Sequence, residues 1–334
     1  MEQIVADVAA FGKDLQAKVP GVKIVLFGCS TAGLIAALAR QKHRDIFIGA
    51  VTSSTAFKFK LANDVYYPVL SQDLSNPSLG GSPQCLATLT NAHMDFANSM
   101  GTAGGRREVE KKLKICDGLL EDVNDQIYTT TEGNLLGTNL QYNDPTCIKD
   151  YCNIRKICDR LTKGSDAALD KLADIYNTNQ PTEPGSCRKR TARGLIDLLK
   201  NRMVESPRRL SAFYICNTRG LLAECSRGSC PFYTNKSWID FWLMVCEEGF
   251  GLSRDEMLKN IGGFQQYVEE SLNKATNILS INGDADPWYP SSITKARAGL
   301  EVMWVKGASH CYWCAHSDKD VVAGILEVVN KWLA

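Results

Sequence analysis

The 334-residue sequence predicts an α/β protein with a parallel sheet and one large insertion, and three observations carry this prediction. Residues 22–27 form an apolar run typical of a buried strand, and residues 34–40 are rich in good helix formers. Two further strand-like runs, residues 275–281 and 300–305, lie near the carboxyl end. Between these parts lie ten of the thirteen cysteines, which indicates an inserted segment held by disulfides.

The turn between the first strand and its helix reads Gly-Cys-Ser-Thr-Ala-Gly at residues 28–33. Small residues two positions before and after a serine let a strand turn sharply into a helix and lift Oγ above the sheet edge. The usual pattern of this nucleophile elbow is Gly-x-Ser-x-Gly, and Ala32 replaces the second glycine. We therefore predict Ser30 as the nucleophile of an α/β-hydrolase core. The alternative is an ordinary turn whose serine only caps the helix.

A nucleophile elbow needs an acid and then a histidine later in the chain. The segment Asn-Gly-Asp-Ala-Asp-Pro-Trp at residues 282–288 follows one predicted strand, and His310 follows the next. His310 would take the Ser30 proton, and a carboxylate would fix the tautomer of its imidazole. The spacing alone leaves Asp284 and Asp286 as alternatives for the acid.

The other three histidines fit the role of base less well. His43 follows the elbow helix in a segment rich in lysine and arginine, which favours a solvated side chain. His93 lies in a predicted helix with a surface or packing role, and His316 falls several residues past the strand end.

Four segments resemble the family of lysosomal Pro-X carboxypeptidase, dipeptidyl peptidase II and thymus-specific serine protease. That family carries an Asn-Gly-x-x-Asp-Pro-Trp loop and then a Gly-x-x-His segment, which residues 282–288 and 307–310 match. Residues 49–54 and 241–250 are similar to two further family segments. The family elbow is Gly-Gly-Ser-Tyr-Gly-Gly, so Ser30 matches while its neighbours depart.

The resemblance implies an α/β-hydrolase core at residues 1–57 and 266–334, split by a cysteine-rich helical cap at residues 58–265. It implies a serine-type exopeptidase that cleaves peptide bonds next to proline through an acyl-enzyme, because the cap would restrict access to chain ends. No cofactor or metal is expected. Peptides are the expected substrates, and a homodimer is a candidate assembly.

The resemblance also implies roles for particular residues. Asp286 rather than Asp284 becomes the acid, and Trp288 lines the pocket for the residue before the scissile bond. Leu34 is a second candidate for substrate binding. The backbone N–H of Thr31, the residue after the nucleophile, would serve the oxyanion hole.

Three alternatives remain open at this stage. Serine carboxypeptidases with a Gly-Glu-Ser-Tyr-Ala-Gly elbow and a Gly-Asp-x-Asp loop share the same triad, but Pro287 and Trp288 favour the Pro-X family. An esterase or lipase on the same fold is a second. The third is a catalytically inactive, hydrolase-like binding protein. This alternative is motivated by the predicted helix at residues 4–15, with which the sequence opens. In the family, several strands and the second donor of the oxyanion hole precede that helix.

Composition bears on partners and compartment. The formal charge of +1 and the absence of aromatic residues around the basic runs argue against nucleic acid, and no apolar run reaches the length of a membrane span. The cysteine content favours a lysosomal or secreted protein, although the amino terminus lacks the pattern of a signal peptide. Asn235 begins a single glycosylation sequon.

Two further expectations concern cysteines and helices. Cys29 is expected to be the odd free thiol, and disulfides are preferred over a zinc site at Cys311 and Cys314. In the middle region, apolar residues from Val109 to Ile127 trace one helical face, and helices are expected near residues 167–176 and 195–199.

Overall fold

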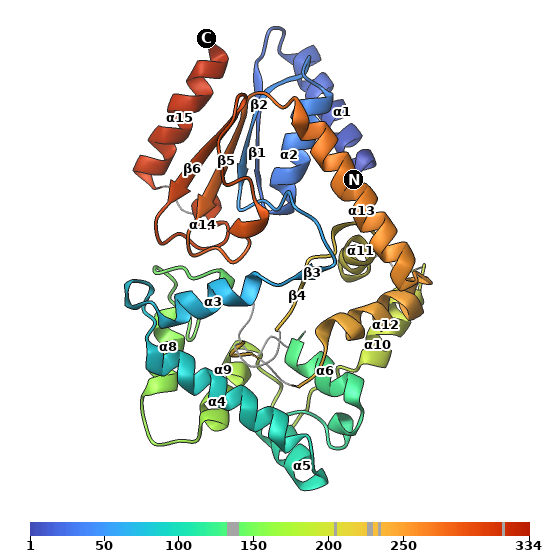
Figure 1. Cartoon of the computed structure of the whole chain (residues 1–334), viewed down its shortest axis with the longest axis vertical. Coiled ribbons are helices and arrows are strands. Elements are labelled where there is room, and N and C mark those ends of the chain that lie inside the picture. Colours follow the sequence, from blue (N-terminus) through green and yellow to red (C-terminus); the bar gives the residue numbers. More distant parts are fainter. Residues whose placement is uncertain (132–139, 204–205, 226–229, 233–234, 316–317) are drawn as a thin grey trace. The chain divides into compact units, whose positions relative to one another are not determined.

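The structure is a computed structural model that describes residues 1–131, 140–203, 206–225, 230–232, 235–315 and 318–334. The chain divides into two compact units (Figure 1). Unit 1 comprises Met1–Phe59 and Gly262–Ala334, and unit 2 comprises Lys60–Ile261. The α/β class is confirmed by helices around a parallel sheet in unit 1. The assignment of the two units to a hydrolase core and a cap stays a prediction.

Unit 1 contains a four-stranded parallel sheet in the order β1-β2-β5-β6. Its strands are β1 (Ile24–Cys29), β2 (Phe47–Ser53), β5 (Ile278–Gly283) and β6 (Leu300–Val305). The inner strands are almost entirely buried, whereas β1 and β6 are partly exposed, and Phe27 on β1 is 63% exposed. All four strands end at the same edge of the sheet, so the loops that follow them lie together.

Helices cover both faces of this sheet (Figure 1). On one face lies α15 (Lys319–Leu333), whose Val328 and Val329 pack against Val51, Leu279 and Ile281. On the other lies α2 (Thr31–Lys42), with α1 (Glu2–Lys18) beside it. The carboxyl-terminal part of α13 (Arg254–Asn273) also belongs to unit 1, as does the short α14 (Tyr312–Ala315).

The predicted first helix forms, but its buried side differs from the apolar side seen in the sequence. Val5, Ala9 and Gly12 face the interior, whereas Phe11 is 70% exposed. Gly12 explains which side of the helix is buried, because a β-carbon there would lie within 2.8 Å of Ile46 and Phe47 side-chain atoms. The side with the smallest residues allows the closest approach.

Unit 2 is mainly helical. Its helices are α3 (Tyr66–Ser75), α4 (Pro83–Ser99), α5 (Ala103–Lys112), α6 (Val123–Thr131), α8 (Ile154–Thr162), α9 (Ala168–Asn179), α10 (Ala192–Lys200), α11 (Pro207–Tyr214) and α12 (Trp238–Phe250), with the start of α13. A short parallel pair, β3 (Ala62–Asn63) and β4 (Leu222–Ala223), completes it. The expected helices near residues 167–176 and 195–199 are α9 and α10.

The ten cysteines of the middle region pair with one another. The disulfides are Cys85–Cys158, Cys116–Cys187, Cys147–Cys152, Cys216–Cys246 and Cys225–Cys230. The expectation of a disulfide-held segment is therefore confirmed. Disulfides of this number are typical of chains that fold in an oxidising compartment.

The single helical face expected from Val109 to Ile127 is wrong. The chain leaves α5 after Lys112 and passes through residues with positive φ at Lys114 and Gly118 before α6 begins. The buried carboxylate of Glu110 accepts hydrogen bonds from the N–H groups of Gly118 and Leu120. These bonds fold the segment back on itself, which a repeat of apolar residues does not reveal.

Within the described part of the chain, we find no helix with both the length and the apolar character required to cross a bilayer.

Candidate active site

Ser30 stands at a sharp turn between β1 and α2. Its backbone has φ of 56° and ψ of −126°, a conformation that a residue with a side chain adopts only at a cost of about 1–3 kcal/mol. Its side chain makes no capping hydrogen bond to α2, which argues against the simple helix-cap alternative. A strained, half-buried serine at this position is the local structure that a nucleophile elbow requires.

Neighbouring glycines make the turn possible. A β-carbon at Gly28 would lie 2.3 Å from the carbonyl oxygen of Ala32, and one at Gly33 would lie 2.0 Å from Oγ1 of Thr55. Both positions therefore exclude every side chain. Ala32 is exposed, so its methyl group meets no such obstacle, which accounts for the departure from Gly-x-Ser-x-Gly.

Asp286 and His310 lie in hydrogen-bond contact, 2.9 Å from Oδ1 to Nδ1. Asp286 is fully buried and His310 is 5% exposed. The same Oδ1 accepts a hydrogen bond of 2.9 Å from the backbone N–H of Trp288, which orients the carboxylate. When Nδ1 of the neutral imidazole carries a proton and donates it to the carboxylate, Nε2 is the nitrogen that can accept a proton.

The structure distinguishes the two neighbouring aspartates. Asp284 is exposed, and its Oδ1 accepts a hydrogen bond from the backbone N–H of Gly307. It therefore holds the start of the histidine loop, whereas Asp286 bonds to the imidazole itself. Gly283 brings the two loops together, because a β-carbon there would lie 1.9 Å from the Ala308 carbonyl oxygen.

Opposing effects set the pKa of His310. Burial alone would lower the pKa of His310, because the charged imidazolium loses its hydration. The charge and hydrogen bond of Asp286, with smaller contributions from Cys311, outweigh burial and raise the pKa of His310 to about 9. The surroundings thus favour the imidazolium, the form that a base reaches when it takes a proton from serine.

The end of β2 connects the serine turn to the histidine loop. The carbonyl of Ser53 accepts a hydrogen bond of 2.8 Å from the N–H of Ser30. The hydroxyl of Ser54 accepts one of 2.8 Å from the N–H of Cys311, next to His310. In the sequence this segment stands out only as a family similarity, without a role. Two consecutive small polar residues at a strand end were the available signal.

A disulfide joins the segment that carries Ser30 to the segment that follows His310. Cys29 and Cys314 form a disulfide with 6.6 Å between their Cα atoms, so β1 is joined to α14. The expectation that Cys29 is free is wrong, and Cys311 is the free cysteine among the described residues. Cys314 lies 285 residues after Cys29 in the chain, so local sequence patterns do not reveal that the two cysteines pair.

The remaining histidines lie elsewhere. His43 directly follows α2 and is half-buried, and His93 is buried in α4, where its ring makes a T-shaped contact with that of Phe232. His316 lies outside the described residues.

Residues 1–328 match the family described as Serine carboxypeptidase S28. This chain belongs to that family. The family resemblance seen in the sequence is thereby confirmed. The elbow departures at Cys29, Thr31 and Ala32 are thus variations within the S28 family.

Two relatives of this S28 chain are similar to it over part of their own length. It is 24% identical over 297 residues to the thymus-specific serine protease of Homo sapiens, covering 86% of this chain and 57% of that protein. It is 21% identical over 364 residues to the lysosomal Pro-X carboxypeptidase of Mus musculus, covering 99% of this chain and 69% of that protein. The chain thus spans little more than half the length of the human relative.

Three further residues were predicted for the site of this S28 chain. The ring of Trp288 lies 6.2 Å from that of His310, centroid to centroid. Thr31 begins α2 and is exposed, and N–H groups in a first helical turn have no acceptor within the helix. Leu34 is 1% exposed, so it packs in the interior, and its predicted contact with substrate stays untested.

A pocket of about 780 Å³ lies elsewhere in unit 1, beside α13. Its lining includes Phe57, Lys58, Gln265, Glu269, Ser292 and Arg297. It contains none of the predicted site residues.

Proposed function

We propose that this chain carries the catalytic residues of a serine exopeptidase that cleaves peptide bonds next to proline. The observation that carries the proposal is the combination of a strained serine at the end of β1 with a buried Asp286–His310 pair. The three residues follow strand ends at one edge of a parallel sheet, in the chain order serine, acid, histidine. The fold proposed for the whole is an α/β-hydrolase core with a cysteine-rich helical cap.

In the proposed reaction, Oγ of Ser30 attacks the peptide carbonyl carbon while Nε2 of His310 takes the hydroxyl proton. Asp286 stabilises the imidazolium through Nδ1. The backbone N–H of Thr31 donates to the oxyanion, a type of contact worth about 10²–10³ in rate. His310 then gives the proton to the leaving amine as the C–N bond breaks, and water releases the acyl group by the same steps in reverse order.

Specificity for proline is proposed from two sources. Trp288 lies against the His310 ring and offers an aromatic surface beside the reacting atoms. The compact, rigid pyrrolidine ring of proline suits such a surface, because packing it costs no side-chain rotamer freedom. One relative is itself called a lysosomal Pro-X carboxypeptidase. That name and the disulfides support a lysosomal or secreted location for this chain.

Peptide hydrolysis tests this proposal. We would offer the folded chain a set of peptides that have proline second from each end and differ only in blocking: neither end, the amino end, the carboxyl end or both ends. An exopeptidase cleaves beside proline when the adjoining end is free. Cleavage of the peptide blocked at both ends would contradict the proposal.

Two variants make the peptide test specific. His310→Ala removes the base, and we expect turnover to fall by several orders of magnitude. His43→Ala is its matched control, because His43 lies at the far end of α2 and has no role in the proposed reaction. Hydrolysis of short acyl esters without peptide cleavage would favour the esterase alternative instead.

A further inference from the structure

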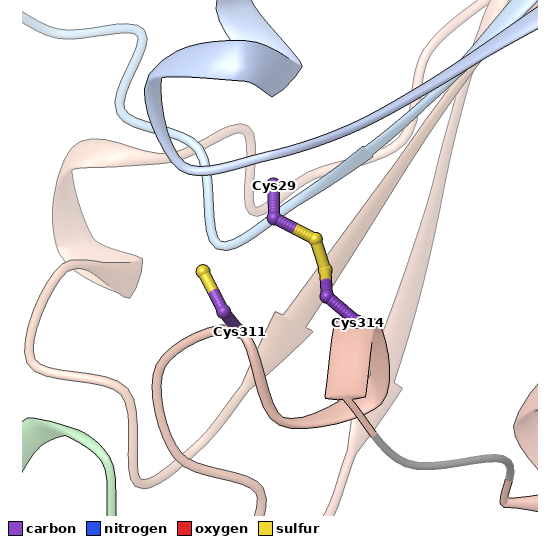
Figure 2. Close-up of side chains that lie close together, drawn as sticks. All are labelled: Cys29, Cys311 and Cys314. Carbon is purple, nitrogen blue, oxygen red and sulfur yellow. A yellow bond between two sulfur atoms is a disulfide. The ribbon is translucent and has the colours of Figure 1, made fainter.

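Three sulfur atoms gather beside the proposed catalytic residues. The Sγ atoms of Cys29, Cys311 and Cys314 all lie within 4.8 Å of one another (Figure 2). Cys29 immediately precedes Ser30, and Cys311 immediately follows His310. Two of the three form the Cys29–Cys314 disulfide, and Cys311 is a half-buried free thiol. We call these three residues the cysteine cluster.

The backbone places Cys311 and Cys314 so that they can also pair with each other. They have Cys-x-x-Cys spacing, and the N–H of Cys314 donates a hydrogen bond of 3.0 Å to the Cys311 carbonyl. Residues three apart in a helical turn have β-carbons about 5–6 Å apart, whereas a disulfide needs about 3.5–4.5 Å. A backbone shift of about 1–2 Å, together with rotation of the two side chains, would therefore bring Cys311 and Cys314 to bonding distance. Figure 2 shows the Cys311 side chain beside the existing disulfide.

Polar groups at the end of β2 hold both partners of this exchange. The hydroxyl of Ser54 accepts from the N–H of Cys311 at 2.8 Å, and Sγ of Cys314 lies 3.4 Å from Oγ of Ser53. The Cys311 side chain is also a hydrogen-bonding neighbour of His310. The thiol is therefore fixed next to both the disulfide and a base.

We propose that the cysteine cluster is a thiol–disulfide exchange site. The Cys311 thiolate attacks Sγ of Cys314, the Cys29–Cys314 bond breaks, and the Cys311–Cys314 bond forms. Cys29 leaves as a thiolate and takes up a proton, which balances the proton that Cys311 gave up. The step is an isomerisation, so it needs no outside oxidant or reductant.

The exchange changes how the proposed catalytic elements are held. With Cys29 bonded to Cys314, the strand that leads to Ser30 is covalently joined to the helix after His310. With Cys311 bonded to Cys314, the crosslink closes a local loop and that covalent connection is lost. This consequence rests on the proposed function, and we expect the nucleophile to react faster in the first state than in the second.

Peptide mapping of the unmodified chain tests the exchange directly. The protein would be incubated at neutral pH, quenched in acid, alkylated with N-ethylmaleimide and digested with trypsin. Cleavage after Lys and Arg gives one peptide, Ile24–Arg40, with Cys29 and Ser30, and a second, Gly307–Lys319, with Cys311 and Cys314. The Cys29–Cys314 state gives the two peptides linked, with Cys311 alkylated. The exchanged state gives them separate, with Cys29 alkylated.

We expect to find both states. Their ratio should become constant with time, and it should reach the same value whether the protein is at first mainly in the Cys29–Cys314 state or mainly in the exchanged state. The Cys311→Ser variant is the matched control and should give only the linked peptides. Linked peptides alone in the unmodified chain, at every time and pH, would overturn the proposal. It would also be overturned by one bound zinc ion per chain with all three thiols protected from alkylation, because the cluster would then be a metal site.

A labelling step separates this inference from the proposed function. Brief treatment with a fluorophosphonate would mark Ser30 on the same tryptic peptide that carries Cys29. We expect the marked fraction to be at least tenfold enriched in the linked state. Equal marking of both states would overturn the effect on the nucleophile. Exchange without any marking would retain the cysteine cluster as an exchange site and count against the proposed peptidase.

Discussion

At the scale of single residues, the proposal depends on two aspartates that are two positions apart and differently placed. Asp286 is buried against the imidazole of His310, whereas Asp284 is exposed and holds the N–H of Gly307. The geometry agrees with the choice that the family resemblance implied. Spacing alone could not decide, since both residues lie in the loop after β5.

This pair gives a matched test. We expect Asp286→Asn to lower the rate of fluorophosphonate labelling by about 10²–10⁴-fold, because the amide disfavours the required tautomer of His310. Asp284→Asn keeps an oxygen acceptor for Gly307 and should change the rate by no more than about twofold. Stopped labelling reactions analysed by mass spectrometry would measure both. Equal losses in the two variants would contradict the assignment of Asp286.

The pKa of His310 gives a second test at this scale. Only the neutral imidazole accepts the Ser30 proton, so we expect labelling to slow as the pH falls through the pKa of His310. Because Asp286 raises that pKa to about 9, the midpoint should lie above the ordinary value of 6.5. In Asp286→Asn the midpoint should move to lower pH. A pH series of labelling rates measures both midpoints, and identical midpoints would contradict the electrostatic account.

At the scale of elements, the serine turn is the segment that the sequence predicts best. Glycines and a serine in fixed spacing dictate a turn that almost no other residues allow. The strand predicted at residues 300–305 also forms, as β6. The buried side of α1 was not predictable, because it depends on what Gly12 meets across the interior. The partner of Cys29 lies in α14, 285 residues later in the chain, and sequence patterns are local.

Glycine substitutions test the turn as an element. Gly28→Ala should lower the free energy of unfolding by about 1–3 kcal/mol, since the new methyl group would overlap the Ala32 carbonyl. Gly263→Ala is the matched control, because Gly263 is an exposed residue of α13 with no atom within 4 Å of the place that a new methyl group would take. There we expect a gain of about 0.5–1 kcal/mol. Chemical denaturation compares the two, and a harmless Gly28→Ala would refute the steric argument.

At the scale of the whole molecule, the two units are held by different means. Unit 1 has a buried parallel sheet with helices on both faces, whereas unit 2 combines short helices with five disulfides in its described part. The edge strand β1 carries an exposed Phe27. The composition predicted a disulfide-held insertion, but which cysteines pair follows from the packing of helices that are distant in sequence.

The disulfides of unit 2 should differ in what they contribute. Cys85–Cys158 closes a loop with a sequence separation of 73, and Cys147–Cys152 one of 5. Loop-closure entropy then gives about 4 kcal/mol for the first and about 2 kcal/mol for the second. Replacing each pair by alanines and following denaturation by circular dichroism would compare them. A larger loss from the short loop would contradict the entropic explanation.

The central claim is that Ser30 is an activated nucleophile, and one measurement tests it most directly. The folded chain would be treated with a fluorophosphonate probe at several pH values, digested, and searched for the modified residue. We expect a single adduct on Ser30 that is absent from Ser30→Ala and strongly reduced in His310→Ala. An unmodified Ser30, in a chain whose circular dichroism shows a folded protein, would contradict the account and favour a binding protein on a hydrolase fold.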